Sequence, residues 1–176
     1  MPLLYALAYP VLKDRDRTFI DAYRDRHDVP YRDVVAPHFT LVFGCEAVSE
    51  KDFCDHVEQV AGQMSPVYFV CRYAMLGVDH QSPTGHVFLV PDEGYGALSL
   101  LHDRLYTGVL RPHLRLDIPF TPHITIGTVD DLSAARRLCD ALNRDGVEII
   151  GRVEALTVGA LVEGRIRDLA RLPLGR

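Results

Sequence analysis

One short segment of this chain occurs twice, and the repeat limits the folds that the chain can adopt. The copies are Pro37-His38-Phe39-Thr40-Leu41-Val42-Phe43 and Pro122-His123-Ile124-Thr125-Ile126-Gly127-Thr128. In a β-strand, residues two apart point to the same face. Each copy therefore predicts a strand with one imidazole and one hydroxyl on one face and apolar side chains on the other. Proline lacks an amide donor and is accepted at the first position of a strand, so each proline predicts strand entry.

The elements expected around the two copies follow the same order in each half. Hydrophobic periodicity, with a capping box at Ser49 and Asp52, predicts strand, helix, motif strand and helix. These lie at about 3–9, 14–27, 38–43 and 49–64 in the first half, and at 86–90, 98–109, 123–127 and 135–142 in the second. A strand at 67–73 separates the halves, and a polar stretch at 79–85 follows it. A run at 147–162, a turn at Glu163-Gly164 and a run at 165–172 predict a closing hairpin.

This order predicts an α+β protein built from two βαβα units with extra strands. We expect a single two-lobed domain over residues 1–176, with pseudo-repeats at about 1–78 and 86–172. If the duplication is twofold-like, the two motifs meet at one cleft.

Composition narrows the possible partners. The chain has 19 basic and 24 acidic residues, for a formal charge of −5. Coating long nucleic acid requires many positive contacts to phosphate, so we expect a nucleotide or a short RNA end as partner. No apolar run approaches membrane-spanning length, and we expect no membrane partner. The four cysteines form no C-x-x-C pair and predict reduced thiols in the cytoplasm.

The two histidines and two threonines suit phosphodiester chemistry. Histidine titrates near neutral pH, so one imidazole can accept a proton while the other donates one to the leaving oxygen. The two hydroxyls can donate hydrogen bonds to the non-bridging phosphoryl oxygens. Such a site needs no metal or other cofactor. The pattern leaves open which histidine is the base.

The paired motifs resemble those of the 2H phosphoesterase superfamily, which includes bacterial 2′-5′ RNA ligase-like proteins and cyclic nucleotide phosphodiesterases. The resemblance implies a bilobal structure with two antiparallel sheets facing a central cleft and helices outside. It also implies metal-independent cleavage or joining at a 2′ oxygen, with His38, Thr40, His123 and Thr125 as catalytic residues. The second motif departs from the RNA ligase-like pattern at Thr128, where a basic residue is often found. This departure weakens the case for a polynucleotide end as the substrate.

Five further residues are candidates for substrate binding. Tyr31 lies in a loop-like approach to the first motif, and Phe43 and Phe120 adjoin the motifs, where a ring could stack on a base or pack in the core. Arg111 and Arg115 precede the second motif and could bind a terminal phosphate, or could be exposed loop residues.

The sequence supports an enzyme that acts on a 2′,3′-cyclic phosphate, an ADP-ribose cyclic phosphate or a 2′-5′ linkage, by hydrolysis or by the reverse joining. One alternative is a binding module of the same fold that senses a nucleotide or RNA end without turnover. Another is a zinc-dependent hydrolase that uses further histidines. Among these, His80 and His86 flank a loop that could lie over a groove, although surface roles are expected for most. No H-E-x-x-H pattern supports the zinc alternative.

Overall fold

The computed structural model describes residues 2–78 and 83–175. The helices are α1 (Asp14–His27), α2 (Glu50–Ala61), α3 (Tyr95–Leu105), the 3-10 helix η1 (Gly108–His113) and α4 (Leu132–Asp145). The strands are β1 (Leu3–Ala8), β2 (Val11–Leu12), β3 (Phe39–Cys45), β4 (Val67–Val78), β5 (Gly85–Glu93), β6 (Ile124–Val129), β7 (Ile149–Val153), β8 (Ala155–Val162) and β9 (Arg165–Pro173).

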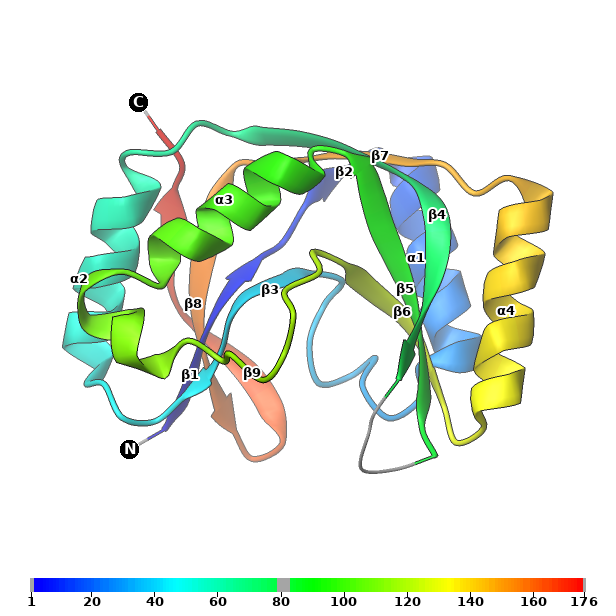
Figure 1. The fold of residues 1–176 in the computed structure, drawn as a ribbon, viewed down its shortest axis with the longest axis horizontal. Coiled ribbons are helices and arrows are strands. Elements are labelled where there is room, and N and C mark those ends of the chain that lie inside the picture. The colour runs from blue at the N-terminus through cyan, green and yellow to red at the C-terminus, as the bar shows by residue number, and fades with distance from the viewer. Residues whose placement is uncertain (1, 79–82, 176) are drawn as a thin grey trace.

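The strands form one curled antiparallel sheet, in the order β2-β7-β4-β5-β6-β3-β1-β8-β9 (Figure 1). The expected α+β class is confirmed. The two sheets that we expected to face each other are instead continuous, because β3 and β6 pair at Phe39 and Ile124. This short bridge is where the two motifs meet, and it divides the sheet into a β3-β1-β8-β9 half and a β2-β7-β4-β5-β6 half.

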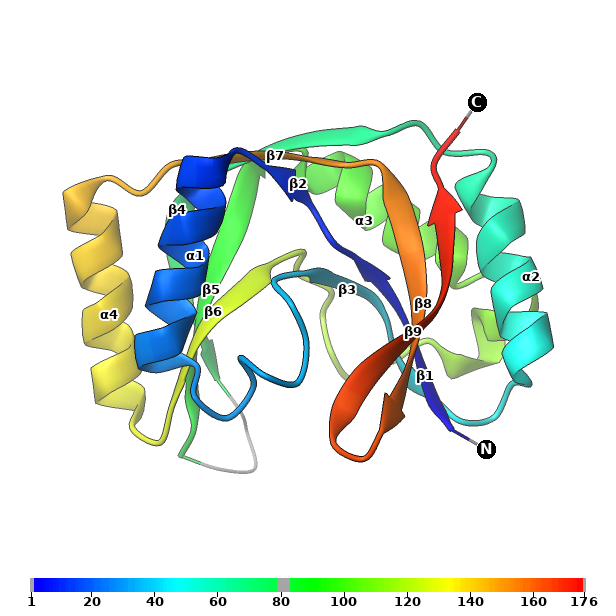
Figure 2. The same cartoon turned by 180° about the vertical axis from the view of Figure 1, so that it is seen from behind.

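The helices cover the outside of each half, and each half borrows one helix from the other part of the chain. α2 packs on β1, β8 and β9, and α3 packs mainly on β3, with further contacts to β4 and β5. α4 packs on β4, β5 and β6, and α1 packs on β6 (Figures 1 and 2). Thus α1 follows β1 in sequence but lies with the second motif, while α3 follows β5 but lies with the first. This exchange ties the two halves together.

Packing between helices and sheet accounts for the apolar side of both motifs. Phe39, Leu41, Ile124 and Ile126 are fully buried in the core. α2 begins as the capping box predicts, because the Ser49 side chain accepts a hydrogen bond from the Asp52 amide. The motif residues between these apolar positions must therefore face away from the core.

Two of the expected elements differ from the structure. We expected one helix to reach Val109, but α3 ends at Leu105 and Val109 lies in η1, because Gly108 adopts a positive φ that an α-helix cannot contain. The run at 147–162 contains two strands, β7 and β8, that join opposite halves of the sheet. The hairpin after it is confirmed, and its turn uses positive φ at Glu163 and Gly164.

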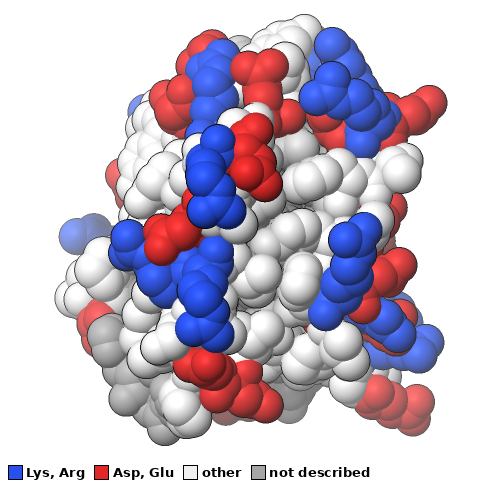
Figure 3. All heavy atoms as spheres, turned by 90° about the vertical axis from the view of Figure 1, so that its right-hand side faces the viewer, with Lys and Arg blue, Asp and Glu red and all other residues white. Residues whose placement is uncertain are grey.

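Charges of both signs are interspersed on the face of the molecule that carries α4 (Figure 3). Several are paired along that helix, as Arg136 is with Asp140 and Arg137 with Asp131. This face has no broad basic surface of the kind that long nucleic acid binds. No helix in the described part of the chain is long and apolar enough to span a membrane.

Candidate active site

A cavity of about 490 Å³ lies where the two halves of the sheet meet. Both motifs contribute to it: His38 and Thr40 from the first, and His123, Thr125 and Thr128 from the second. Its other lining residues are Tyr5, Leu7, Arg24, Asp28, Tyr31, Val34, Val35, His86, Phe88, Leu161, Gly164 and Ile166. The structure thus brings the four residues carried by the repeat to one place.

The bridge between β3 and β6 explains this convergence. Phe39 and Ile124 are paired and both point into the core. Their neighbours along each strand must then point to the opposite face, which is the cavity. His38 and His123 each lie one residue before the start of their strand, so the bridge holds the two imidazoles at the closest approach of the two halves.

A hydrogen bond to the preceding backbone orients each histidine in the same way. His38 Nδ1 lies 2.8 Å from the Ala36 carbonyl oxygen, and His123 Nδ1 lies 2.6 Å from that of Thr121. A carbonyl oxygen can only accept, so Nδ1 carries the proton in both rings and Nε2 is left for the cavity. Each accepting residue precedes a proline, which favours an extended backbone at that residue. The proline of each motif therefore helps to fix the tautomer of the histidine after it.

The two histidines differ in what surrounds the rest of the ring. His38 Nε2 lies 3.1 Å from Thr40 Oγ1, where the neutral ring accepts a hydrogen bond from the hydroxyl. The His123 ring instead stacks on Phe88, with centroids 3.7 Å apart and planes 22° from parallel. The ring nearest to His38 is that of Tyr9, edge-on at 6.3 Å. The imidazole of the first motif is thus hydrogen-bonded to a hydroxyl, and the imidazole of the second motif packs against the face of an aromatic ring.

Both histidines lose their proton more readily than a free imidazole, because the pKa of each is lowered. Burial is the main cause that lowers the pKa of His38 to about 4, and the charges of Arg24 and His123 act in the same direction. Burial also lowers the pKa of His123, and the neighbouring His86 adds to that effect. A negatively charged ligand between the rings would favour the protonated form of either one.

His86, Phe88 and Thr128 also line the cavity, although the sequence analysis named His86 only as flanking a loop and Thr128 only as a departure from the motif. His86 Nδ1 lies 3.2 Å from Thr128 Oγ1, and the His86 ring stacks on Phe88. Thr128 reaches the same face as Thr125 because the register of β5 and β6 shifts between Val87 and Phe88, as at a β-bulge. The alternation of His86 and Phe88 in a predicted strand is the signal that could have placed both on one face.

A buried ion pair supports the wall of the cavity next to His38. Arg24 Nε donates to Asp28 Oδ2 at 2.8 Å, and the other guanidinium nitrogens donate to the carbonyls of Val35 and Tyr31. The same wall is tied to β9, because the Ile166 amide donates to the Val34 carbonyl. Arginine and aspartate four apart at the end of a predicted helix were the available sequence signal.

The candidates for substrate binding lie in different places. Tyr31 lines the cavity and is about half exposed. Phe43 lies on β3, where its amide donates a hydrogen bond to the Tyr106 hydroxyl, and Phe120 stacks on the buried His102. Arg111 lies in η1, and Arg115 is paired with Asp117. The structure does not bring these four to the cavity lining, and His80 lies outside the described residues.

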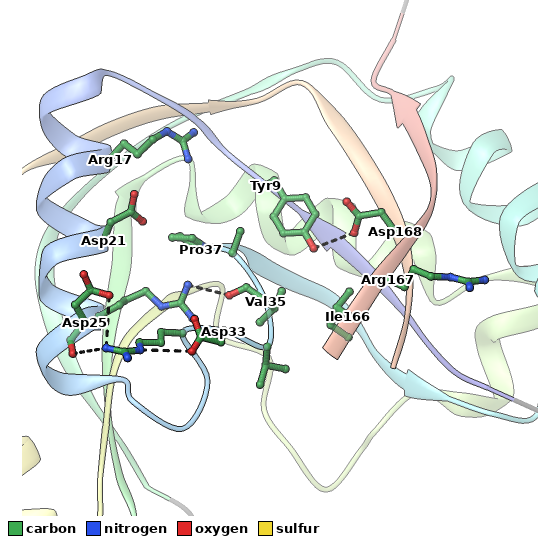
Figure 4. A pocket seen from close by; sticks show the side chains of 14 residues that line it. Tyr9, Arg17, Asp21, Asp25, Asp33, Val35, Pro37, Ile166, Arg167 and Asp168 are labelled. Carbon is green, nitrogen blue, oxygen red and sulfur yellow. Dashed lines mark hydrogen bonds and ion pairs between the residues drawn. The ribbon is translucent and has the colours of Figure 1, made fainter. Parts of the chain in front are cut away.

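A larger depression, of about 760 Å³, lies on the other side of the segment at 34–37 (Figure 4). Some of its side chains pair with one another: Arg32 pairs with Asp25 and Asp33, and Tyr9 donates to Asp168. Of the residues in the two repeated motifs, its lining includes Pro37 and none of the histidines or threonines. We therefore assign the chemistry to the smaller cavity.

The cavity contains three imidazoles, which raises the question of a metal. Within residues 2–78 and 83–175, no three His, Cys, Asp or Glu side chains are grouped closely enough to hold an ion.

Comparison with known proteins agrees with the motifs. The sequence profile of the 2′-5′ RNA ligase superfamily matches residues 12–165. The chain belongs to this superfamily. Two curated relatives are named as phosphoesterases. One, from Geobacillus sp. (strain WCH70), is 30% identical over 116 residues, or 64% of this chain and 62% of its own length. The other, from Bacillus licheniformis, is 27% identical over 110 residues, or 60% of each. The match spans less than two thirds of either relative.

Solved structures show that this chain shares its fold with other proteins over almost its whole length. A protein from Thermus thermophilus matches with a TM-score of 0.61 and 18% identity, over 99% of each chain. E. coli LigT in complex with 3′-AMP matches with a TM-score of 0.59 and 22% identity, also over 99% of each chain. Apo LigT matches with a TM-score of 0.55 and 24% identity, over 99% of this chain and 98% of its own.

Proposed function

We propose that this protein is a metal-independent phosphodiesterase that opens a 2′,3′-cyclic, ADP-ribose cyclic or 2′-5′ phosphodiester, with His38 and His123 as its base and acid. The observation that carries the proposal is the pair of imidazoles at one cavity, each with Nδ1 bound to the backbone, so that Nε2 is the nitrogen that can exchange a proton with a ligand. Membership of the superfamily supports the reaction class.

The reaction needs one imidazole of each charge. The neutral histidine takes a proton from water, and the water oxygen forms a bond to phosphorus. The bond from phosphorus to the leaving ribose oxygen then breaks, and that oxygen takes the proton of the charged histidine. Thr125 donates a hydrogen bond to a non-bridging oxygen as negative charge accumulates there. The Thr40 hydroxyl turns from His38 Nε2 to the other non-bridging oxygen, which frees that nitrogen to take the proton. Exchange of protons with solvent restores the starting charges, and the joining reaction uses the same groups in reverse.

The cavity also supports a nucleotide as the ligand. Beyond the His and Thr side chains its lining is mostly apolar, and a volume of about 490 Å³ is in the range of small-molecule sites. LigT has been crystallised with 3′-AMP, ATP and NADP+.

The four unpaired thiols fit our expectation of a cytoplasmic protein.

A substrate panel tests the proposal. Purified protein would be incubated with 2′,3′-cyclic nucleotides, an ADP-ribose cyclic phosphate and a 2′-5′ dinucleotide, with and without excess chelator. We expect turnover of at least one substrate that survives chelation. Loss of activity on stripping, restored by zinc, would instead indicate a metal-bound nucleophile. Tight binding of an intact ligand without turnover would indicate a sensing module.

A further inference from the structure

The two motifs have equivalent neighbours on the adjacent strand, and these neighbours differ. Leu7 on β1 is paired with Thr40, just as Phe88 on β5 is paired with Thr125. Both side chains line the cavity. Only the second half therefore has an aromatic ring at this position.

The Phe88 ring is held against His123 by the strand on its other side. A Cβ atom at Gly77 on β4 would lie 2.3 Å from Phe88 Cε2 and 2.4 Å from Cζ, so the ring occupies space that only glycine leaves open. The His86 ring, nearly parallel to Phe88 at 5.7 Å, packs against it as well. The face-on contact with His123 is therefore built into the sheet.

Resting on the proposed function, we propose that Phe88 is a positioning residue that keeps His123, through this face-on contact, as the charged partner and thus as the proton donor. The face of a phenyl ring is negative, and it attracts a cation placed over it. An imidazolium at 3.7 Å gains from that face, whereas neutral imidazole gains less. His38 has no such face, and the Thr40 hydroxyl bound to its Nε2 favours the neutral ring. The geometry therefore makes His38 the base.

Other groups around His123 act on the same equilibrium. His86 on β5 disfavours a positive charge on His123, and His38 and His123 disfavour a charge on one another. Arg24 at the end of α1 acts on His38. The remaining titratable groups of the cavity are Asp28, Tyr5 and Tyr31. Against burial and positive charge, the hydrogen bond to the Thr121 carbonyl raises the pKa of His123, and the Phe88 face adds to that effect.

The test must change the charge distribution of the Phe88 ring and keep its size. Removing the ring would also admit water and obscure the direction of the change in the pKa of His123. Phenylalanine analogues with increasing numbers of ring fluorines would be incorporated at position 88, and the His123 imidazole would be titrated by NMR in the free protein. We expect the pKa of His123 to fall stepwise, by roughly 0.5 to 1 unit over the series. An unchanged pKa would overturn the proposal.

The chain offers a matched control. Phe120 stacks on His102 of α3 at the same centroid distance, 3.7 Å, with 7° between planes, and does not line the cavity. The fluorinated series at position 120 should leave the pKa of His123 unchanged. In the Gly77→Ala variant the Phe88 ring must move, so the pKa of His123 should depend less on the number of fluorines at position 88. Full dependence in that variant would contradict the assigned contact.

Activity separates this inference from the proposed function. If His123 is the donor, the alkaline limb of kcat/KM should move to lower pH together with the titrated pKa. A shifted pKa with a fixed limb would show that His123 is not the donor. If no substrate is turned over while the pKa still follows the series, the proposed function fails and the electrostatic role of Phe88 stands.

Discussion

The half of the molecule that carries His38 and the half that carries His123 share a backbone plan but differ in the side chains around it. Both histidines bond through Nδ1 to a carbonyl before a proline. His38 then meets a threonine hydroxyl and a wall supported by Arg24, while His123 meets aromatic rings. An acid and a base must be in opposite charge states at one pH. Repetition of the backbone thus supplies two imidazoles, and unlike neighbours make them chemically different.

Among the tests of this difference between the two halves, removing either imidazole should have the largest effect on activity. His38→Ala and His123→Ala should each lower kcat/KM by roughly 10²- to 10⁴-fold, because each removes one proton-transfer partner. The double variant should lose little more than either single one, since groups that act as a unit are non-additive. His113→Ala, in η1, is the control. Losses that multiply in the double variant would show that the two halves act independently.

The arginines that precede the two motifs should differ strongly in their effect on stability. Arg24→Ala leaves Asp28 charged and buried, so the free energy of unfolding should fall by about 3 to 5 kcal/mol. Arg115→Ala breaks an exposed pair with Asp117 and should leave the free energy of unfolding nearly unchanged. Urea unfolding of both variants measures the difference. Equal losses of unfolding free energy would mean that the segments before the two motifs are stabilised to the same extent.

The two hydroxyls should matter less than the two imidazoles. Thr40→Ala and Thr125→Ala should each lower kcat/KM by roughly 10²-fold, by the loss of one donor to the phosphoryl oxygens. Thr40→Ala also removes the hydrogen bond to neutral His38, so it should raise the pKa of His38 and move the acid limb to higher pH. Thr125→Ala should leave that limb in place. Serine at either position should restore most of the activity, and an alanine-like loss with serine would argue against a donor role.

The smallest expected effect is the dependence of kcat/KM on pH. kcat/KM reports on the free protein, where the base must be neutral and the acid charged. Activity should therefore rise with pH through about 4, as His38 loses its proton. It should fall again as His123 loses its proton, below the ordinary value of 6.5. The limbs belong to the coupled pair. Initial rates across pH measure both, and a profile that still rises above about pH 7 would contradict the assignment.

Much of the site was predictable because its determinants are local in sequence. The alternation around His38 and His123 fixes which side chains share a face, and the element order repeated around them predicts the α+β class. The same residues carry the likeness to the superfamily that the sequence profile confirms. The capping box at Ser49 and the turn at Glu163-Gly164 are local in the same way, and both lie where they were expected.

The rest depends on contacts between residues that are distant in sequence, so no local pattern could specify it. The single bridge of Phe39 and Ile124 joins what periodicity describes as two sheets. The shift in register that brings Thr128 to the cavity depends on how β5 and β6 pair. The stack of Phe88 on His123 depends further on space left by Gly77 on a third strand. The sequence by itself determined which residues could do chemistry, and tertiary packing decided what surrounds each histidine, because burial, charge and ring contacts are set by neighbours in space.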